Sequence, residues 1–339
     1  MAPRPLARSV MAVALTAATL TGCGHSASTD RGAHLTLRLG YLTRITHASA
    51  LVGIDRGLFA KNLGPGTTLD AQPFGQGTAE ATALLSGKID AAYVGPNPAF
   101  NAWQKSGGTA IKIVSGSAQG GTSFVVKPDI KSAEDLRGKT VADPALGGNH
   151  DVLLRSWLKE HGLQTNKQGG GDVFVKPTKP ESAIVQEFTA NQIAGAVESA
   201  PYDVQMVKDG GVRLWPDLGT ITILVVRQEF LAAHPDAVAA LLRGQIEADE
   251  LIHTNPVAAQ QSANNALAKS VGKGLDADVL DASFRETTFT NDPDAASLND
   301  LARKSVSVGL LDPIDLKGLF DLAPLNRVLQ STGRPQVNS

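Results

Sequence analysis

The chain has almost no cysteine, since Cys23 is the only one among its 339 residues. A single cysteine excludes an internal disulfide and a metal site built from several thiolates. An excess of positive charge is missing too: 31 Lys and Arg stand against 33 Asp and Glu, a formal charge of −2. Because binding to nucleic acid calls for a basic surface, this balance argues against nucleic acid as a partner.

Catalytic motifs are also missing. The sequence contains no Gly-x-Ser-x-Gly elbow, no His-Glu-x-x-His pair and no Walker loop with its lysine. The stretch GQGTAE, from Gly75 to Glu80, has the wrong spacing for a dinucleotide-binding turn. Asp151 and His161 are too far apart on one predicted helix to bind the same metal ion. We therefore expect a binding protein that is not an enzyme and uses neither cofactor nor metal.

The one long apolar run stands near the N-terminus, from Val10 to Leu20 after Arg4 and Arg8. It is too short to span a bilayer and is typical of an export signal. The run leads into LTGC, which resembles the bacterial lipobox, where cleavage before the cysteine leaves an acylated N-terminal residue. We interpret residues 1–22 as a signal peptide and 23–33 as lipidated Cys23 with a flexible polar tether. The alternative is a plain secretory signal beside an unmodified cysteine.

Two stretches resemble each other, Leu84–Phe100 and Glu187–Asp203, aligned at Ile89 and Ile193. In each, an amphipathic helix ends at a residue that tolerates the left-handed conformation, Gly87 or Asn191. A buried strand and a loop containing proline follow. The repetition predicts two similar α/β lobes, although a chance match is the alternative.

Predicted strands and helices alternate along the first two thirds of the chain, a pattern typical of parallel sheets with helices on both faces. The last third is mainly helical. Predicted strands are 35–42, 67–74, 89–94, 111–115, 140–143, 173–176, 193–197, 212–215 and 220–226. Predicted helices are 47–61, 78–86, 99–105, 149–161, 178–190, 235–253, 295–308 and 316–321. Thr178 and Glu181 have the spacing of a capping box at the start of their helix.

These elements divide into two lobes. We assign residues 34–120 and 221–339 to lobe 1 and residues 121–220 to lobe 2, with crossings near 119–126 and 216–225. Two crossings form a hinge about which a cleft opens and closes. Loops at the carboxyl ends of the strands should wall that cleft, because open α/β sheets bind ligands there.

Polar and glycine-rich loops follow the predicted strands and supply the candidate site. Gly148 and Asn149 precede a helix whose free N–H groups and dipole favour an anion, and Arg44 offers a planar set of charged donors. The candidate ligand-binding residues are Arg44, Thr46, His47, Gln76, Gly77, Thr78, Pro96, Asn97, Ser117, Gly121, Thr122, Gly148, Asn149, His150, Glu198 and Tyr202.

Five of these residues have a structural alternative. His47 fits a helix cap, and His150 fits a solvated first turn of a helix. Arg44 fits an exposed loop cation, Glu198 one half of a local ion pair, and Tyr202 a core side chain.

Three segments carry a resemblance to a known family: LGYLTRITHASALVGIDRGLFAKNLG, GQGTAEATALLSGKIDAAYVGPNPAFNAWQKSGG and ADPALGGNHDVLLRSWLKEHGL. They resemble the solute-binding lipoproteins of ABC importers in the nitrate, taurine and aliphatic sulfonate group. The resemblance implies the type II periplasmic-binding-protein fold: two α/β lobes, each a mostly parallel sheet flanked by helices, joined by two crossover hinge segments around an enclosed ligand.

The chain departs from that family inside the expected cleft. Relatives often have Asn where this chain has Arg44, and Gly-Asn-Thr-Gln-Asp where it has the shorter run from Gly148 to Asp151. The solute's identity therefore does not follow from the resemblance.

Together these patterns predict a monomeric lipoprotein, anchored by its lipid on the extracytoplasmic face of the cell membrane. It would deliver a small anionic organic solute, an aliphatic sulfonate or a taurine-like compound, to an ABC permease and its ATPase. Three alternatives stay open: a secreted two-lobed enzyme using His47 or Glu198 as acid or base, a binding protein for a neutral or cationic solute, and an adhesion or scaffold protein.

Overall fold

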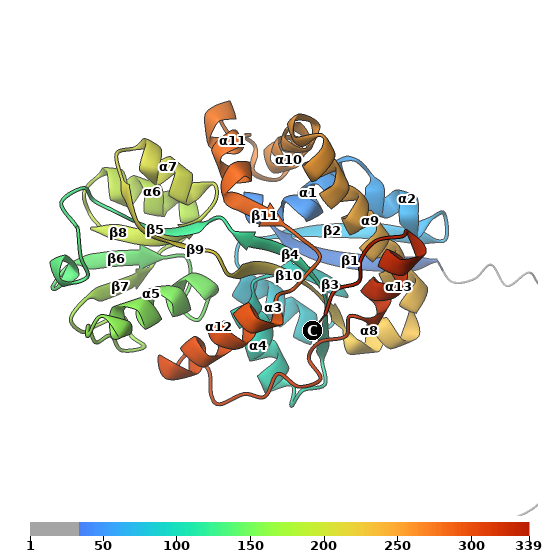
Figure 1. Cartoon of the computed structure of the whole chain (residues 1–339), viewed down its shortest axis with the longest axis horizontal. Helices are drawn as coiled ribbons and strands as arrows, with labels where there is room; N and C mark the ends of the chain where they lie inside the picture. The colour runs from blue at the N-terminus through green and yellow to red at the C-terminus, as the bar shows by residue number, and fades with distance from the viewer. Residues whose placement is uncertain (1–33, 339) are drawn as a thin grey trace, which may run out of the picture. The chain divides into compact units, whose positions relative to one another are not determined.

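The computed structural model describes residues 34–338, so the expected signal peptide, Cys23 and tether lie outside the described residues. Two sheets organise the described chain, and Figure 1 shows helices packed around both. One has six strands in the order β11-β4-β10-β3-β1-β2, and the other has five in the order β7-β6-β8-β5-β9. We call each sheet with its helices a lobe, lobe 1 for the first and lobe 2 for the second. The predicted two-lobed α/β fold is confirmed.

The elements follow one another in three runs along the chain. The first run belongs to lobe 1: β1 (Leu35–Leu42), η1 (Ile45–His47), α1 (Ala48–Asp55), α2 (Leu58–Leu63), β2 (Thr67–Phe74), α3 (Gly77–Leu85), β3 (Ala91–Val94), α4 (Pro96–Lys105) and β4 (Ile111–Gly120). The second forms lobe 2: β5 (Thr122–Val126), η2 (Glu134–Leu136), β6 (Thr140–Asp143), α5 (Asn149–Glu160), β7 (Phe174–Pro177), α6 (Glu181–Thr189), β8 (Gly195–Ser199), α7 (Tyr202–Lys208) and β9 (Val212–Asp217). The third returns to lobe 1: β10 (Thr220–Arg227), α8 (Gln228–Ala233), α9 (Pro235–Thr254), α10 (Pro256–Val271), α11 (Ala277–Glu286), β11 (Thr287–Phe289), α12 (Ala295–Ser307) and α13 (Ala323–Ser331).

The predicted repeat is confirmed by the sheet topology. β3 lies between a parallel neighbour, β1, and an antiparallel one, β10, and β8 lies in the same way between β6 and β5. The helix before each strand is followed by a left-handed residue, Gly87 with φ +69° and Asn191 with φ +58°. The two stretches are therefore one structural unit used in both lobes.

The sheets are mixed, which corrects the expectation of mostly parallel sheets. β1 pairs in parallel with β2 and β3, but β10 pairs antiparallel with both β3 and β4. In lobe 2, β5 is likewise antiparallel to β8 and β9. The reason is that the chain enters β5 and β10 directly from a strand of the other lobe. It therefore runs through these two strands in the direction opposite to their neighbours β3, β4, β8 and β9, each of which follows a helix of its own lobe.

The chain changes sheets twice, and both crossings lie near the centre of Figure 1. β4 leads into β5 through Gly120 and Gly121, whose φ values of +69° and +63° favour glycine. β9 returns to β10 through Leu218 and Gly219. Two short connections restrain the lobes to rotation about one axis, the geometry of hinge closure.

Two predicted helices are wrong in part, and a third is wrong altogether. Residues 47–61 form η1, α1 and α2 instead of one helix, because Gly57 adopts φ +66° between α1 and α2. The helix expected from Thr178 begins at Glu181 after Pro180, without a capping box. No helix covers 316–321, since Gly318 has φ +81° and Phe320 bridges to Ile113, and α13 follows instead.

Among residues 34–338, no helix combines the length and apolar character needed to cross a membrane. The described helices pack on their sheets. On β3, Tyr93 faces the cluster with α1 and α9, and Ala92 faces the cluster with α3 and α4. The two clusters therefore cover opposite faces of the sheet at β3.

The core of lobe 1 holds a buried carboxyl group. Asp249 on α9 is 3% exposed, and its Oδ1 accepts a hydrogen bond of 2.5 Å from the hydroxyl of Ser49. Its Oδ2 has no hydrogen-bond partner among the described residues. Burial raises the pKa of Asp249 to about 7.

We predict that Asp249→Asn weakens the pH dependence of stability. An ordinary aspartate has a pKa of about 3.9, so between about pH 4 and 7 the folded protein retains a proton that the unfolded chain releases. The free energy of unfolding should therefore fall as the pH rises, by up to about 1.4 kcal/mol per pH unit from this group. Urea unfolding at pH 4, 5.5 and 7 measures the slope. Asp236→Asn, at the exposed start of the same helix, is the control, and an equal slope in both variants would contradict the assignment.

Candidate functional site

A cavity of about 40 Å³ lies between the lobes, and we call it the inner cavity. Lobe 1 lines it with the loops after β1, β2 and β3, and lobe 2 with the loop after β6. Nine candidate residues line it: Arg44, Thr46, His47, Gln76, Gly77, Thr78, Gly148, Asn149 and His150. The structure thus brings together loops that are far apart in the sequence. A role of these residues in binding stays a prediction.

Two helices of opposite lobes begin at the inner cavity. α3 starts at Gly77 in lobe 1 and α5 starts at Asn149 in lobe 2, and neither has a side-chain cap. The side chain of Gln76 donates instead to the carbonyl of Pro144 across the lobes, at 2.7 Å. The first N–H groups of a helix have no partner within it, and the helix dipole makes this end positive. Both walls therefore favour a negatively charged group.

Thr46 and His47 add two uncharged side-chain donors. Thr46 is 1% exposed, and its hydroxyl has no partner among the described residues. Nδ1 of His47 accepts the backbone N–H of Leu42 at 3.3 Å, so the proton of the neutral ring is on Nε2. Burial, with the charge of Arg44 beside it, holds the pKa of His47 well below its usual range. His47 is therefore neutral, and its Nε2–H is available as a donor.

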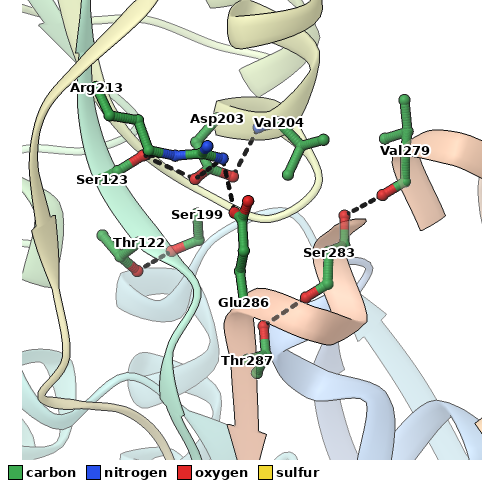
Figure 2. Close-up of polar contacts among 10 residues, drawn as sticks. All are labelled: Thr122, Ser123, Ser199, Asp203, Val204, Arg213, Val279, Ser283, Glu286 and Thr287. Carbon is green, nitrogen blue, oxygen red and sulfur yellow. Dashed lines mark hydrogen bonds and ion pairs between the residues drawn. The ribbon is translucent and has the colours of Figure 1, made fainter. Parts of the chain in front are cut away.

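His150 is fixed by a hydrogen-bonded chain within lobe 2. Its Nε2 lies 2.7 Å from the hydroxyl of Ser199. Figure 2 shows the next bond of the chain, in which the Ser199 hydroxyl lies 2.7 Å from that of Thr122. Burial and the nearby Arg44 also lower the pKa of His150. The ring is therefore uncharged at neutral pH and is not the solvated residue of the alternative interpretation.

Arg44 forms an ion pair with Glu181, the first residue of α6, across the two lobes. Both side chains are about nine-tenths buried, so Arg44 is not an exposed loop cation. On its other side lies a second space of about 670 Å³, which we call the outer pocket. Arg44, Leu42 and Gln76 line both spaces, so the pair stands at the border between them.

Glu198 is completely buried, and neither of its carboxyl oxygens has a hydrogen-bond partner among the described residues. It therefore forms no local ion pair. Burial raises its pKa well above the usual range, and the charge of Glu181 raises it further. Glu80 in the first turn of α3 is in the same condition, buried and without a partner for either oxygen.

Several candidates join the lobes or lie behind the cavity. The backbone N–H of Asn97 donates to Oδ1 of Asn149 at 2.8 Å, and Nδ2 of Asn97 donates to the carbonyl of Gly147 at 2.7 Å. Nδ2 of Asn149 donates to the carbonyl of Ile221 at 3.3 Å. These bonds hold the lobes in a closed arrangement. Pro96 starts α4, Ser117 is buried in β4, Gly121 forms a crossing and Thr122 lies on β5, and none of these four lines the inner cavity.

A further contact between the lobes lies outside the cavity. Arg213 on β9 bonds the carboxylate of Glu286 at the end of α11 at 2.6 Å (Figure 2). It also reaches the hydroxyl of Ser123 at 3.2 Å and lies 3.5 Å from Asp203. Burial raises the pKa of Asp203 to about 6.

Sequence reasoning missed Glu181 as a site residue and placed Tyr202 there only as a wall residue; both line the outer pocket. Glu181 follows β7 just as Gln76 follows β2, so the repeat itself held the signal. Within residues 34–338, no cluster of three or more His, Cys, Asp or Glu side chains is arranged to hold a metal ion.

We predict that Thr46→Val leaves the free energy of unfolding unchanged or raises it by up to about 1 kcal/mol, because a buried hydroxyl without a partner costs stability. Thr220 is the matched control, since its buried hydroxyl donates to the carbonyl of Pro293 at 2.9 Å. Thr220→Val should lower stability by about 1–2 kcal/mol. Chemical denaturation of both variants gives the comparison. A loss in Thr46→Val as large as in Thr220→Val would show that the Thr46 hydroxyl has a structural partner.

Comparisons with known proteins cover most of the chain. Residues 31–277 match the sequence model of the NMT1-like family. The taurine-binding periplasmic protein of Escherichia coli strain K12 is 29% identical over 204 residues, 58% of this chain and 61% of that protein. The match therefore spans less than two thirds of that relative's length.

Solved structures share the fold. The periplasmic nitrate-binding protein NrtA from Synechocystis PCC 6803 superposes with a TM-score of 0.74 at 16% identity, over 88% of this chain and 89% of that one. The alkanesulfonate-binding protein SsuA from Xanthomonas axonopodis pv. citri, bound to MOPS, superposes with a TM-score of 0.69 at 18% identity, over 84% and 98%. At these identities the likeness concerns the fold alone.

Proposed function

The chain belongs to the NMT1-like family, and on that premise we propose that it is the extracytoplasmic solute-binding component of an ABC importer. In this function it encloses a small solute between its lobes and presents it to a membrane permease whose transport is driven by a cytoplasmic ATPase. The names of its relatives, which bind taurine, nitrate or alkanesulfonates, support the class.

One observation carries the choice of solute. The uncapped starts of α3 and α5 meet at the inner cavity from opposite lobes, together with the free hydroxyl of Thr46 and Nε2 of His47. All four are hydrogen-bond donors, and two carry the positive end of a helix dipole. This set suits the oxyanion head of an organic acid, and an aliphatic sulfonate or a taurine-like compound is the proposed solute.

The same arrangement explains how binding would favour closure. An oxyanion that bonds α3 in lobe 1 and α5 in lobe 2 has both sets of donors only when the lobes are together. Such a solute stabilises the closed population by the difference between its affinities for the two states. The hydrogen bonds between Asn97 and the loop before α5 would add to that closure.

We predict that the protein binds ethanesulfonate at least tenfold more tightly than ethanesulfonamide, which has a similar shape and no charge. Hydrogen bonds to a charged group are stronger than those to a neutral one by roughly 1 kcal/mol or more each. Isothermal titration calorimetry measures both affinities. Thr46→Val should weaken sulfonate binding by about fivefold to tenfold, while Thr220→Val should retain it. Equal affinity for the sulfonamide would contradict the anionic head, and chemical alteration of the recovered solute would favour an enzyme.

The membrane attachment is a separate proposal that rests on the sequence around Cys23. Export and acylation would hold the protein beside its permease, because several acyl chains bind a bilayer far more firmly than one. We predict that Cys23→Ala moves the protein from the membrane fraction to the soluble extracytoplasmic fraction after a high-salt wash. Ser26→Ala, in the proposed tether, is the control and should remain attached. A Cys23→Ala protein that stays on the membrane would refute the lipid anchor.

A further inference from the structure

α11 belongs to lobe 1, but both of its ends contact lobe 2. The helix packs against η1 of its own lobe and lies beside α7 of the other (Figure 1). At its N-terminal end, Asp276 and Asp278 lie 3.5 Å and 2.8 Å from Nζ of Lys208, the last residue of α7. At its C-terminal end, Glu286 bonds Arg213 on β9 at 2.6 Å. Two charged contacts, one at each end of α11, therefore join the lobes outside both the inner cavity and the outer pocket.

The contact at Glu286 is the better supported of the two. Figure 2 shows that two other groups of lobe 2 hold Arg213, the Ser123 hydroxyl at 3.2 Å and the Asp203 carboxylate at 3.5 Å. The Arg213 and Glu286 side chains are 29% and 34% exposed, whereas Lys208 and its two partners are 46% to 67% exposed. An exposed pair adds little stability, since solvent screens it and ordering two mobile side chains costs entropy. Arg213 is already ordered, so its pair with Glu286 adds more.

α11 is also fixed to the wall of the inner cavity and to a crossing. Leu280 and Phe284 of α11 belong to the same core cluster as Ile45 of η1, the segment that supplies two donors to the inner cavity. β11 follows α11 directly, and Thr287 of β11 pairs with Gly120 at the first crossing. A contact that holds α11 against lobe 2 therefore also holds this wall of lobe 1 against lobe 2.

We propose that α11 is a strap that favours the closed arrangement before any solute binds, chiefly through the ion pair of Glu286 with Arg213. This inference does not depend on the identity of the solute. When the lobes rotate apart about the crossings, Glu286 moves with lobe 1 and Arg213 moves with lobe 2. Arg213 keeps Asp203 as a partner in the open form, so opening leaves no buried charge without a counterion. The strap therefore shifts the balance between the two forms without locking the protein in either.

Distances between the lobes test the strap in protein from which any solute has been removed by unfolding in urea and refolding. Spin labels at Lys88→Cys in lobe 1 and Lys131→Cys in lobe 2, both exposed positions, report the closed and open populations by double electron–electron resonance. Cys23→Ser in every sample leaves these as the only thiols. We expect Glu286→Gln to lower the ratio of closed to open protein about threefold to tenfold, the effect of losing a partly buried ion pair.

Two further variants of the strap serve as comparisons. Asp281→Asn is the matched control, because Asp281 pairs with Arg285 inside α11 and its loss should leave the ratio unchanged. Asp278→Asn should change the ratio by less than about twofold, because the pair of Asp278 with Lys208 is exposed. Urea unfolding confirms that each variant folds.

Salt gives a second measurement that needs no change in the strap. Raising sodium chloride from about 0.05 M to about 0.5 M screens the pair, so it should open the parent protein more than Glu286→Gln. A Glu286→Gln protein with the same populations as the parent, or an Asp281→Asn protein that opens as far, overturns the strap. A solute-free parent that is already open at low salt overturns it as well.

Discussion

The structure depends on the two places where the chain passes directly from a strand of one lobe's sheet into a strand of the other's. β5 enters lobe 2 directly from β4, and β10 enters lobe 1 directly from β9. Each of these strands is hydrogen-bonded on both sides, β5 to β8 and β9, and β10 to β3 and β4. The connections from β4 to β5 and from β9 to β10 are therefore held at both ends by a sheet. Only the few residues between the two sheets can change conformation freely. This constraint sets the loops after β1, β2, β3 and β6 around one space and limits their relative motion to closure.

Electrostatics within that space follow from burial. The two histidines at the inner cavity are uncharged, because burial and Arg44 both disfavour a second positive charge. Burial also raises the pKa of Glu80 and of Glu198 and favours their protonated forms, whereas the charge of Arg44 acts on both in the opposite direction. In the proposed function, the region would recognise a charged solute with fixed dipoles, neutral donors and a single ion pair. Such groups need little rearrangement when a solute replaces water, which favours selectivity over raw charge attraction.

Much of the fold could be predicted from the sequence because the signals were local. The repeat around Gly87 and Asn191, the strand ends and the start of α5 all appear as short patterns, and nine of the candidate residues do meet at one cavity. What was missed depends on contacts across the lobes. The antiparallel direction of β5 and β10 and the partnership of Arg44 with Glu181 join residues that no local pattern relates. The break at Gly57 was visible, but helical periodicity on both sides of it favoured one continuous helix.

The hydrogen bonds from Asn97 to Asn149 and to Gly147 join one lobe directly to the other. Their strength therefore sets how much of the protein is closed while empty. In the proposed function, solute enters only the open form, so the rate of capture falls in proportion to the fraction of the protein that is open. Asn97 and Asn149 would thus affect both the release and the capture of a solute. In the proposed function they would lengthen the residence of a bound solute and lower the rate at which the empty protein captures one.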